Sequence, residues 1–114
     1  MITLGIDVGT FETKGVLVRD GATGTGTVRV FAAGLGWHED PATGSAALGT
    51  GIWLAAEGLA AEGVTDYPLT QGQALGRPAE LAGRVTVAGG VVTAVSVAGA
   101  VRAIASGTVR VPAW

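Results

Sequence analysis

At helical spacing, the apolar residues of one long stretch of the chain fall on every side, whereas elsewhere apolar residues occur in short runs. Residues 45–62 carry alanine, leucine, isoleucine and tryptophan, with no polar face before the last turns. A helix that is apolar on every side is surrounded by protein. We therefore predict one central helix over residues 45–62, with Gly58 and Gly63 as its end signals. On this helix we expect Trp53 and Leu54 to be largely buried.

The remaining apolar runs are short and alternate with polar residues, which is typical of β-strands with one buried face. These runs predict strands at residues 2–8, 13–19, 28–31, 66–69, 85–88, 91–97, 101–105 and 108–111. Between them, residues 20–26 read as a glycine-rich turn or linker, and residues 32–38 as a loop.

Two glycine-containing dipeptides predict tight hairpins near the end of the chain. Gly89-Gly90 and Ser106-Gly107 each separate two Val-rich runs by two residues, the spacing of a hairpin turn. Pro68 places its short strand at a sheet edge or before a bulge, because proline lacks the N–H that a ladder needs. Strands on both sides of a single helix predict an α+β fold, an antiparallel or mixed sheet wrapped around one central buried helix.

The composition bounds the size and the surface of the protein. The 114 residues suffice for a single domain, residues 1–114, with a core of its own. Hydrophobic residues make up 48% of the chain and charged residues 14%, well under the usual quarter. A domain this poor in charge is expected to keep an apolar surface. We therefore expect a homo-oligomer, most simply a dimer.

The charge and the rare residue types exclude several classes of function. A net charge of −2 with seven scattered basic residues argues against nucleic-acid or membrane-surface partners. The lack of cysteine excludes disulfides, zinc–thiolate sites and cysteine nucleophiles, and one histidine cannot make a His-rich metal site. We expect no metal and no cofactor. No secretory signal or transmembrane run is recognisable, so the expected location is cytoplasmic.

The stretch Glu39-Asp40-Pro41-Ala42-Thr43-Gly44-Ser45-Ala46 stands directly before the apolar helix and carries the main candidate chemistry. A helix N-terminus presents free N–H groups and a partial positive charge, which favour a bound anion. A small carboxylate or sulfate is therefore a candidate ligand at this helix start. Asp40 reads either as the helix N-cap or as a proton-transfer group, and both roles can coexist. Thr43 and Ser45 are the alternative caps.

A second stretch, Gln71-Gly72-Gln73-Ala74-Leu75-Gly76-Arg77-Pro78, follows at a compatible distance. Together the two stretches resemble the hallmarks of the phenazine-biosynthesis isomerase (PhzF-like) family, whose fold is that of diaminopimelate epimerase. The resemblance covers residues 27–112 and implies one epimerase-like lobe. It makes Gly72, Gly76 and Arg77 candidate ligand contacts. The alternative is a crossing turn for the glycines, and a pairing of Arg77 with Asp40 or Glu80.

In the family that the chain resembles, the aspartate of the first hallmark faces a glutamate from an N-terminal lobe, and the two carboxyl groups shift a proton. The resemblance gives the aspartate's role to Asp40. It gives the binding of a ligand carboxylate to Gly44, Ser45 and the adjoining Ala46. No glutamate in residues 1–26 stands in a context like that of the opposing acid. His38 is a further candidate for moving protons, against the alternative of an exposed loop residue.

The front of the chain has a different likeness. Residues 4–18 resemble the opening hairpin of sugar kinases of the actin-like ATPase class, whose Asp-x-Gly-Thr turn lies beside nucleotide phosphates. Residues 1–22 thus look like a grafted β-hairpin, and the two resemblances suggest a recombined or engineered chimera, or a truncated natural gene. We favour a hairpin that only supplies strands, because a phosphate loop needs an opposing lobe. We expect residues 2–19 to pair into the main sheet.

Three functions stay open on the sequence. The first, which we rank highest, is an isolated or chimeric PhzF-like lobe that self-associates without efficient catalysis. The second is a PhzF-like isomerase that works as a homodimer by proton transfer through Asp40, with His38 or Glu39 as the second group. The third is a nucleotide-binding fragment that uses the front hairpin.

Overall fold

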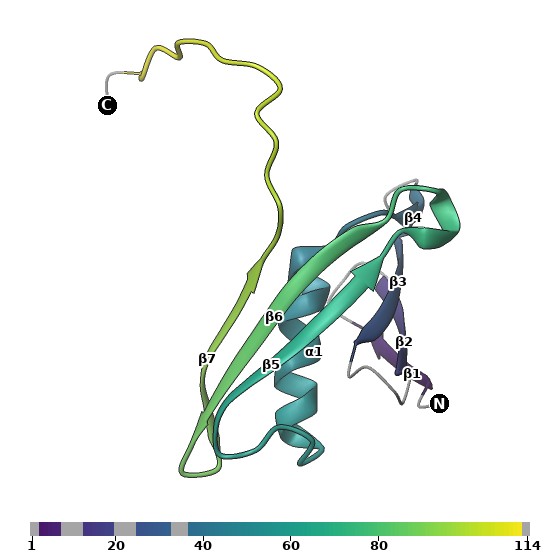
Figure 1. Ribbon diagram of the computed structural model, residues 1–114, viewed down its shortest axis with the longest axis vertical. Helices are drawn as coiled ribbons and strands as arrows, with labels where there is room; N and C mark the ends of the chain where they lie inside the picture. The colour runs from purple at the N-terminus through teal and green to yellow at the C-terminus, as the bar shows by residue number, and fades with distance from the viewer. Residues whose placement is uncertain (1–2, 8–12, 20–24, 33–36, 113–114) are drawn as a thin grey trace.

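A computed structural model describes residues 3–7, 13–19, 25–32 and 37–112, and within them the fold is α+β, as predicted (Figure 1). One helix packs against a curled, mixed sheet of seven strands in the described part of the chain. The elements, in chain order, are β1 (Thr3–Asp7), β2 (Thr13–Arg19), β3 (Gly26–Ala32), β4 (Trp37–Asp40), α1 (Gly44–Ala56), β5 (Gly63–Gln71), the 3₁₀ turn η2 (Gln73–Leu75), β6 (Ala79–Ala88) and β7 (Val91–Ala98).

The sheet runs in the order β1-β2-β3-β5-β6-β7, and β4 pairs with β3 beside this path. The front hairpin belongs to this sheet, as predicted, because β2 pairs with β3 along its whole length. The pairing of β3 with β5 is parallel, from Gly26↔Leu69 to Val28↔Gln71, and the other pairings are antiparallel. Residues 9–12, between the two predicted front strands, lie outside the described part of the chain, as does most of the predicted linker over residues 20–26.

The predicted loop over residues 32–38 is wrong at both of its ends. Ala32 ends β3, and β4 begins at Trp37, while residues 33–36 lie outside the described part. β4 pairs with β3 through Val30↔Asp40 and Ala32↔Trp37, with a bulge between them. Its sequence, Trp-His-Glu-Asp, has no alternation of its own. The neighbouring strand therefore decides its conformation, which is why the local pattern missed it.

β5 is longer and more central than the predicted edge strand at residues 66–69. It runs from Gly63 to Gln71 and lies between β3 and β6. Pro68 is tolerated because the pairing with β3 begins one residue later, at Leu69, so no N–H is required on that side. The next hairpin is confirmed: β6 and β7 are joined by Gly89 and Gly90, with φ of 60° and 75°.

Helix α1 ends six residues earlier than predicted. Gly58 is the end signal, with φ of 69°, and the two backbone N–H groups that follow it donate to Leu54 O at 2.8 and 3.1 Å. These bonds satisfy carbonyl groups that the last turn leaves free. Gly63, the other predicted end signal, instead begins β5.

Only one face of α1 is buried in the described structure. Its buried residues are Ala46, Ala47, Thr50 and Gly51. Ile52 is 50% exposed, and Trp53 and Leu54 are half-buried, so the prediction that both are largely buried is wrong in extent. In the view of Figure 1 the helix lies beside β5, β6 and β7, and the front strands β1, β2 and β3 lie to its right. Trp53, Leu54 and Ala55 pack against the margin of the core, whereas Ile52 faces solvent.

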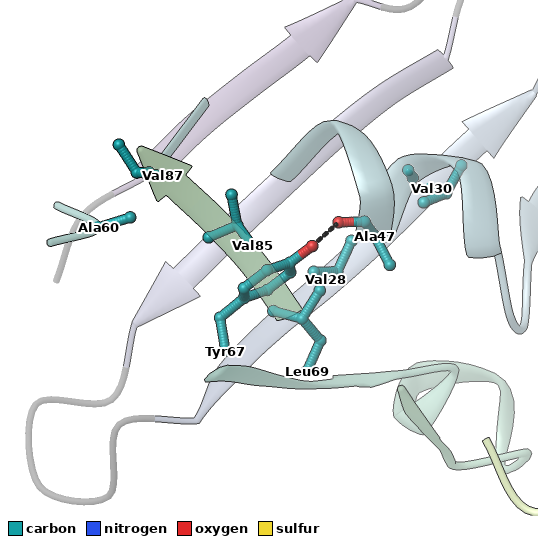
Figure 2. Packing of buried hydrophobic residues seen from close by; sticks show 9 residues of the cluster. Val28, Val30, Ala47, Ala60, Tyr67, Leu69, Val85 and Val87 are labelled. Carbon is teal, nitrogen blue, oxygen red and sulfur yellow. Dashed lines mark hydrogen bonds between the residues drawn. The ribbon is translucent and has the colours of Figure 1, made fainter. Parts of the chain in front are cut away.

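Tyr67 of β5 fills the space between the helix and the sheet (Figure 2). It is 5% exposed, and its hydroxyl donates to Ala47 O at 3.1 Å. Burial raises the pKa of this hydroxyl, partly offset by the backbone of Gly51. The ring lies against Gly51 on the helix and Gly83 on β6, where an added Cβ would stand 2.6 Å from Tyr67 Cζ in either case. The surrounding cluster contains Val28, Val30, Ala46, Ala47, Ala60, Leu69, Val85 and Val87.

The second predicted C-terminal hairpin, at residues 101–111, is wrong. Residues 99–112 contain no strand, and Figure 1 shows them running away from the end of β7. Their large aliphatic side chains are exposed, Val101 by 92% and Ile104 by 95%. A strand pattern forms a strand only where a partner edge is available, and an isolated two-stranded hairpin is marginal in water. Of the residues that the structure describes, none form a helix with the length and apolar content needed to span a bilayer.

Candidate functional site

The candidate site lies where three elements meet. Asp40 ends β4, Gly44 begins α1, and Gln71 ends β5. Asp40 is half-buried and stands opposite Val30, a core residue of β3. The two hallmark stretches of the sequence are therefore brought together in space, although about thirty residues separate them along the chain.

The side chain of Gln71 joins the two stretches. It is fully buried, and its Oε1 accepts the backbone N–H of Thr43 at 3.0 Å. Its Nε2 donates to Asp40 O at 2.6 Å and to Thr43 Oγ1 at 3.0 Å. The Thr43 hydroxyl in turn donates to Asp40 Oδ2 at 2.6 Å. The loop from Asp40 to Thr43 is thus tied to the end of β5 through one amide.

Gly72 lets the backbone of the second stretch approach that loop. Its φ is 81°, in the left-handed region, and an added Cβ would stand 2.7 Å from Pro41 O and overlap Arg77 O. This is a crossing turn beside the helix start, the role that the sequence suggests for the glycines. Gly76, also left-handed with φ of 64°, ends η2 and is exposed.

The helix N-cap position is Thr43, one of the two alternatives, and not Asp40, which lies three residues earlier in β4. Thr43 makes no side-chain cap bond, because its hydroxyl is engaged with Asp40. The N–H groups of the first turn, at Gly44, Ser45 and Ala46, have no partner within the helix. Ser45 is exposed, whereas Ala46 is buried.

The space around Gly44 does not demand glycine. A Cβ there would stand 3.6 Å from Val97 Cγ1, an ordinary van der Waals contact. Close packing of the protein at this helix start therefore does not explain the glycine.

Of the groups suggested as partners of Asp40, none reaches it in the described residues. Glu39 is held by Arg29, whose Nε and Nη2 donate to its carboxylate at 3.0 and 2.9 Å. This hydrogen-bonded pairing, together with the charge of Arg29, lowers the pKa of Glu39. His38 and Arg77 are exposed. Within the described ranges the ion pairs are Arg29–Glu39 and Asp66–Arg84, so Arg77 pairs with neither Asp40 nor Glu80.

An open hollow of about 720 Å³ adjoins the loop but does not contain its acid. It is bordered by Ala42, by residues 78–82 and by residues 98–100, with Glu80 as its charged member. Asp40, Ser45 and Arg77 are not among its lining residues. In the described part of the chain, no three His, Cys, Asp or Glu side chains gather where they could hold a metal ion.

A sequence model of one protein family, described as phenazine biosynthesis-like protein (PhzC-PhzF), matches residues 10–107, most of the chain. The chain belongs to this family. The match begins ahead of residue 27, so this PhzF-like region includes β2 as well as both hallmark stretches. A comparison with curated proteins gives no match.

Gln71 begins the second hallmark stretch, but the sequence alone indicated no role for it. Tyr67, Leu69 and Gln71 alternate along β5 and are all buried. A polar residue in an inward-facing position of a strand requires buried partners for its amide. That signal was hidden because the predicted strand stopped at Leu69, two residues too early.

Proposed function

We propose that this chain is a PhzF-like lobe that self-associates and offers Asp40 as one acid of a proton-transfer pair, without efficient catalysis of its own. The observation that carries the proposal is the surroundings of Asp40. Among the described residues, Thr43 is the side chain that hydrogen-bonds its carboxylate, and no second titratable group does so.

Proton transfer between carbon atoms needs a base to remove a proton and an acid to return one. Two groups in different protonation states serve this best, as pairs of carboxyl groups do in other enzymes. Glu39 is occupied by Arg29, and His38 is exposed to water. Within the described part of the chain no other acid or base bonds Asp40, which supports a second acid that comes from another lobe and a lack of efficient turnover by this chain alone.

Self-association is supported by the apolar surface that the fold leaves uncovered. Val101, Ile104, Val109 and Val111 are each more than three-quarters exposed, and Ile52 on the helix is half-exposed. In the described sheet β7 also pairs on one side only, with β6, which leaves an edge to which an extended segment can add. A second copy of this chain would remove such surface from water, with a gain of about 25 cal/mol per Å² of apolar area.

The start of α1 is proposed to hold a small carboxylate or sulfate weakly. Three backbone N–H groups support this, those of Gly44, Ser45 and Ala46, and so does the exposed residue Ser45. Packing within the protein does not require glycine at position 44, which also agrees with a role in binding. Because one open face cannot exclude water from the ligand, we expect a Kd in the millimolar range, about 4 kcal/mol.

A PhzF-like isomerase that works as a homodimer through Asp40 is the alternative. It is favoured by one observation: the Thr43 hydroxyl donates a hydrogen bond to Asp40 and does not cap the helix. In that case a second copy would have to bring an acid or base to Asp40. Turnover that rises with the fraction of dimer would favour this alternative over a lobe without efficient catalysis.

Sedimentation equilibrium over a hundredfold range of concentration tests the self-association. We expect a reversible rise from monomer to dimer, weakened at least tenfold in the double variant Val101→Ser/Ile104→Ser. Ala103→Ser, on the same exposed segment, is the matched control and should leave the dissociation constant unchanged. A monomer at every concentration would overturn the proposal.

A further inference from the structure

The bonding pattern around Gln71 admits one orientation of its amide. The backbone N–H of Thr43 is a donor only, so the atom that meets it must be Oε1. The backbone oxygen of Asp40 is an acceptor only, so the atom that meets it must be Nε2. The flipped amide would oppose a donor to a donor and an acceptor to an acceptor in a fully buried place.

This orientation fixes the direction of the Thr43 hydroxyl. Gln71 Nε2 has two hydrogens, one for Asp40 O and one for Thr43 Oγ1, at 2.6 and 3.0 Å. The hydroxyl oxygen of Thr43 therefore accepts from Gln71, and its single hydrogen is left to donate to Asp40 Oδ2 at 2.6 Å. That length lies in the range of hydroxyl donation to a charged carboxylate.

The consequence reaches the two oxygens of Asp40. Because Oδ2 already accepts the hydrogen of Thr43, it is the oxygen that remains the carbonyl oxygen when the carboxyl group is protonated, and the proton goes to the other oxygen. We propose that Gln71 is a positioning residue that acts through Thr43, so that Oδ2 of Asp40 stays an acceptor and Oδ1 is the atom that takes up and releases the proton. The role in proton transfer rests on the proposed function, whereas the bonding pattern does not.

The arrangement is held from the backbone side as well. Gln71 also binds the carbonyl of Asp40 itself, and Gly72 allows Pro41 O to approach the end of β5. The carboxyl group is therefore fixed at its main chain and at one oxygen. A proton-transfer group needs this, because a small displacement of the acid from its substrate lowers the rate.

Proton NMR of the ¹⁵N-labelled whole chain tests the relay without any substrate. In the unaltered protein, the side-chain N–H protons of Gln71 should exchange with solvent at least tenfold more slowly than those of the exposed Gln73. In Thr43→Val one of the two Gln71 protons should move upfield, since it loses its acceptor, and Thr43→Ser should restore it. Thr50→Val is the matched control, because it removes a buried hydroxyl that bonds Ala46 O on the same helix. It should leave the Gln71 protons unchanged.

Gln71 protons that exchange as fast as those of Gln73, or that respond equally to the changes at Thr43 and Thr50, would overturn the relay. The exchange comparison needs no variant, so it decides even where Thr43→Val fails to fold.

Infrared spectroscopy tests the assignment of the oxygens. The carbonyl stretch of protonated Asp40 is isolated as the difference between the chain and its Asp40→Asn variant in acid. A hydrogen bond to the carbonyl oxygen lowers this frequency, so it should rise in Thr43→Val and return in Thr43→Ser. An unchanged frequency, or no protonated Asp40 before the fold is lost, would overturn the assignment. Because neither measurement involves turnover or self-association, a failure here is distinguishable from a failure of the proposed function.

Discussion

Two glycines of the same helix are expected to respond in opposite ways to one added methyl group. Gly49 and Gly51 both lie inside α1, where alanine is favoured over glycine by about 1 kcal/mol. Nothing stands within 4 Å of a Cβ at Gly49. A Cβ at Gly51 would stand 2.6 Å from Tyr67 Cζ and 2.8 Å from its Cε1, closer than real Cβ atoms approach. Gly49→Ala should therefore stabilise the fold, and Gly51→Ala should destabilise it.

The magnitude follows from how firmly Tyr67 is held. Its ring is blocked on the far side by Gly83, and its hydroxyl is bonded to Ala47 O. Overpacking of this kind costs about 1–3 kcal/mol, and loss of the hydroxyl bond adds about 1 kcal/mol. After the gain in helix propensity, Gly51→Ala should lower the free energy of unfolding by about 1–3 kcal/mol. Gly49→Ala should raise it by about 0.5–1 kcal/mol.

Urea unfolding followed by circular dichroism, at one protein concentration for all variants, measures both changes. The two variants should differ by about 1.5–4 kcal/mol, in opposite directions from the unaltered chain. Equal stabilisation by the two alanines would refute the packing of Tyr67 against Gly51.

Two further predictions concern the same core. Tyr67→Phe should lower the free energy of unfolding by about 1 kcal/mol at neutral pH. Because the pKa of the folded-state hydroxyl is raised above 10.0, its contribution is complete below about pH 10 and is lost as the pH rises further. The unaltered chain should thus lose stability more steeply than Tyr67→Phe above that pH, and parallel alkaline profiles would contradict this. Trp53→Ala should lower the free energy of unfolding in urea by about 2 kcal/mol. This is less than the roughly 3–5 kcal/mol of a fully buried tryptophan, because Trp53 is half-buried. A loss of the full amount would mean that Trp53 is completely buried.

Local chemistry predicted the parts of the fold that depend on few residues. Gly89-Gly90 forms the expected turn because both residues adopt positive φ, and the long apolar stretch forms the helix. The runs at 85–97 and 101–111 share the same local pattern, yet only the first becomes a hairpin in the described structure. The difference lies in their pairing: β6 pairs with β5 along its length, whereas residues 99–112 form no strand and pair with none. A partner of this kind is a tertiary property that the local pattern does not contain.

The candidate site divides in the same way. The motif indicated Asp40 and the turn at Gly72, because an acid before a helix and a glycine beside it have recognisable local roles. It did not indicate Gln71, whose partners Asp40 and Thr43 come from the other hallmark stretch. Nor did it exclude Glu39 as the second proton-transfer group. Only the structure does so, because Arg29 on the neighbouring strand binds the Glu39 carboxylate.

Exchange of substrate hydrogen with solvent tests the central claim most directly. The chain and its Asp40→Asn variant are incubated in D₂O with a 2,3-dihydro-3-hydroxyanthranilate-like substrate, at concentrations below and above the self-association midpoint. Deuterium uptake is then read by mass spectrometry. A lobe that supplies one acid of the pair should give no uptake above that of Asp40→Asn at any concentration. Uptake that requires Asp40 and grows with the fraction of dimer would contradict this account and establish the homodimeric isomerase.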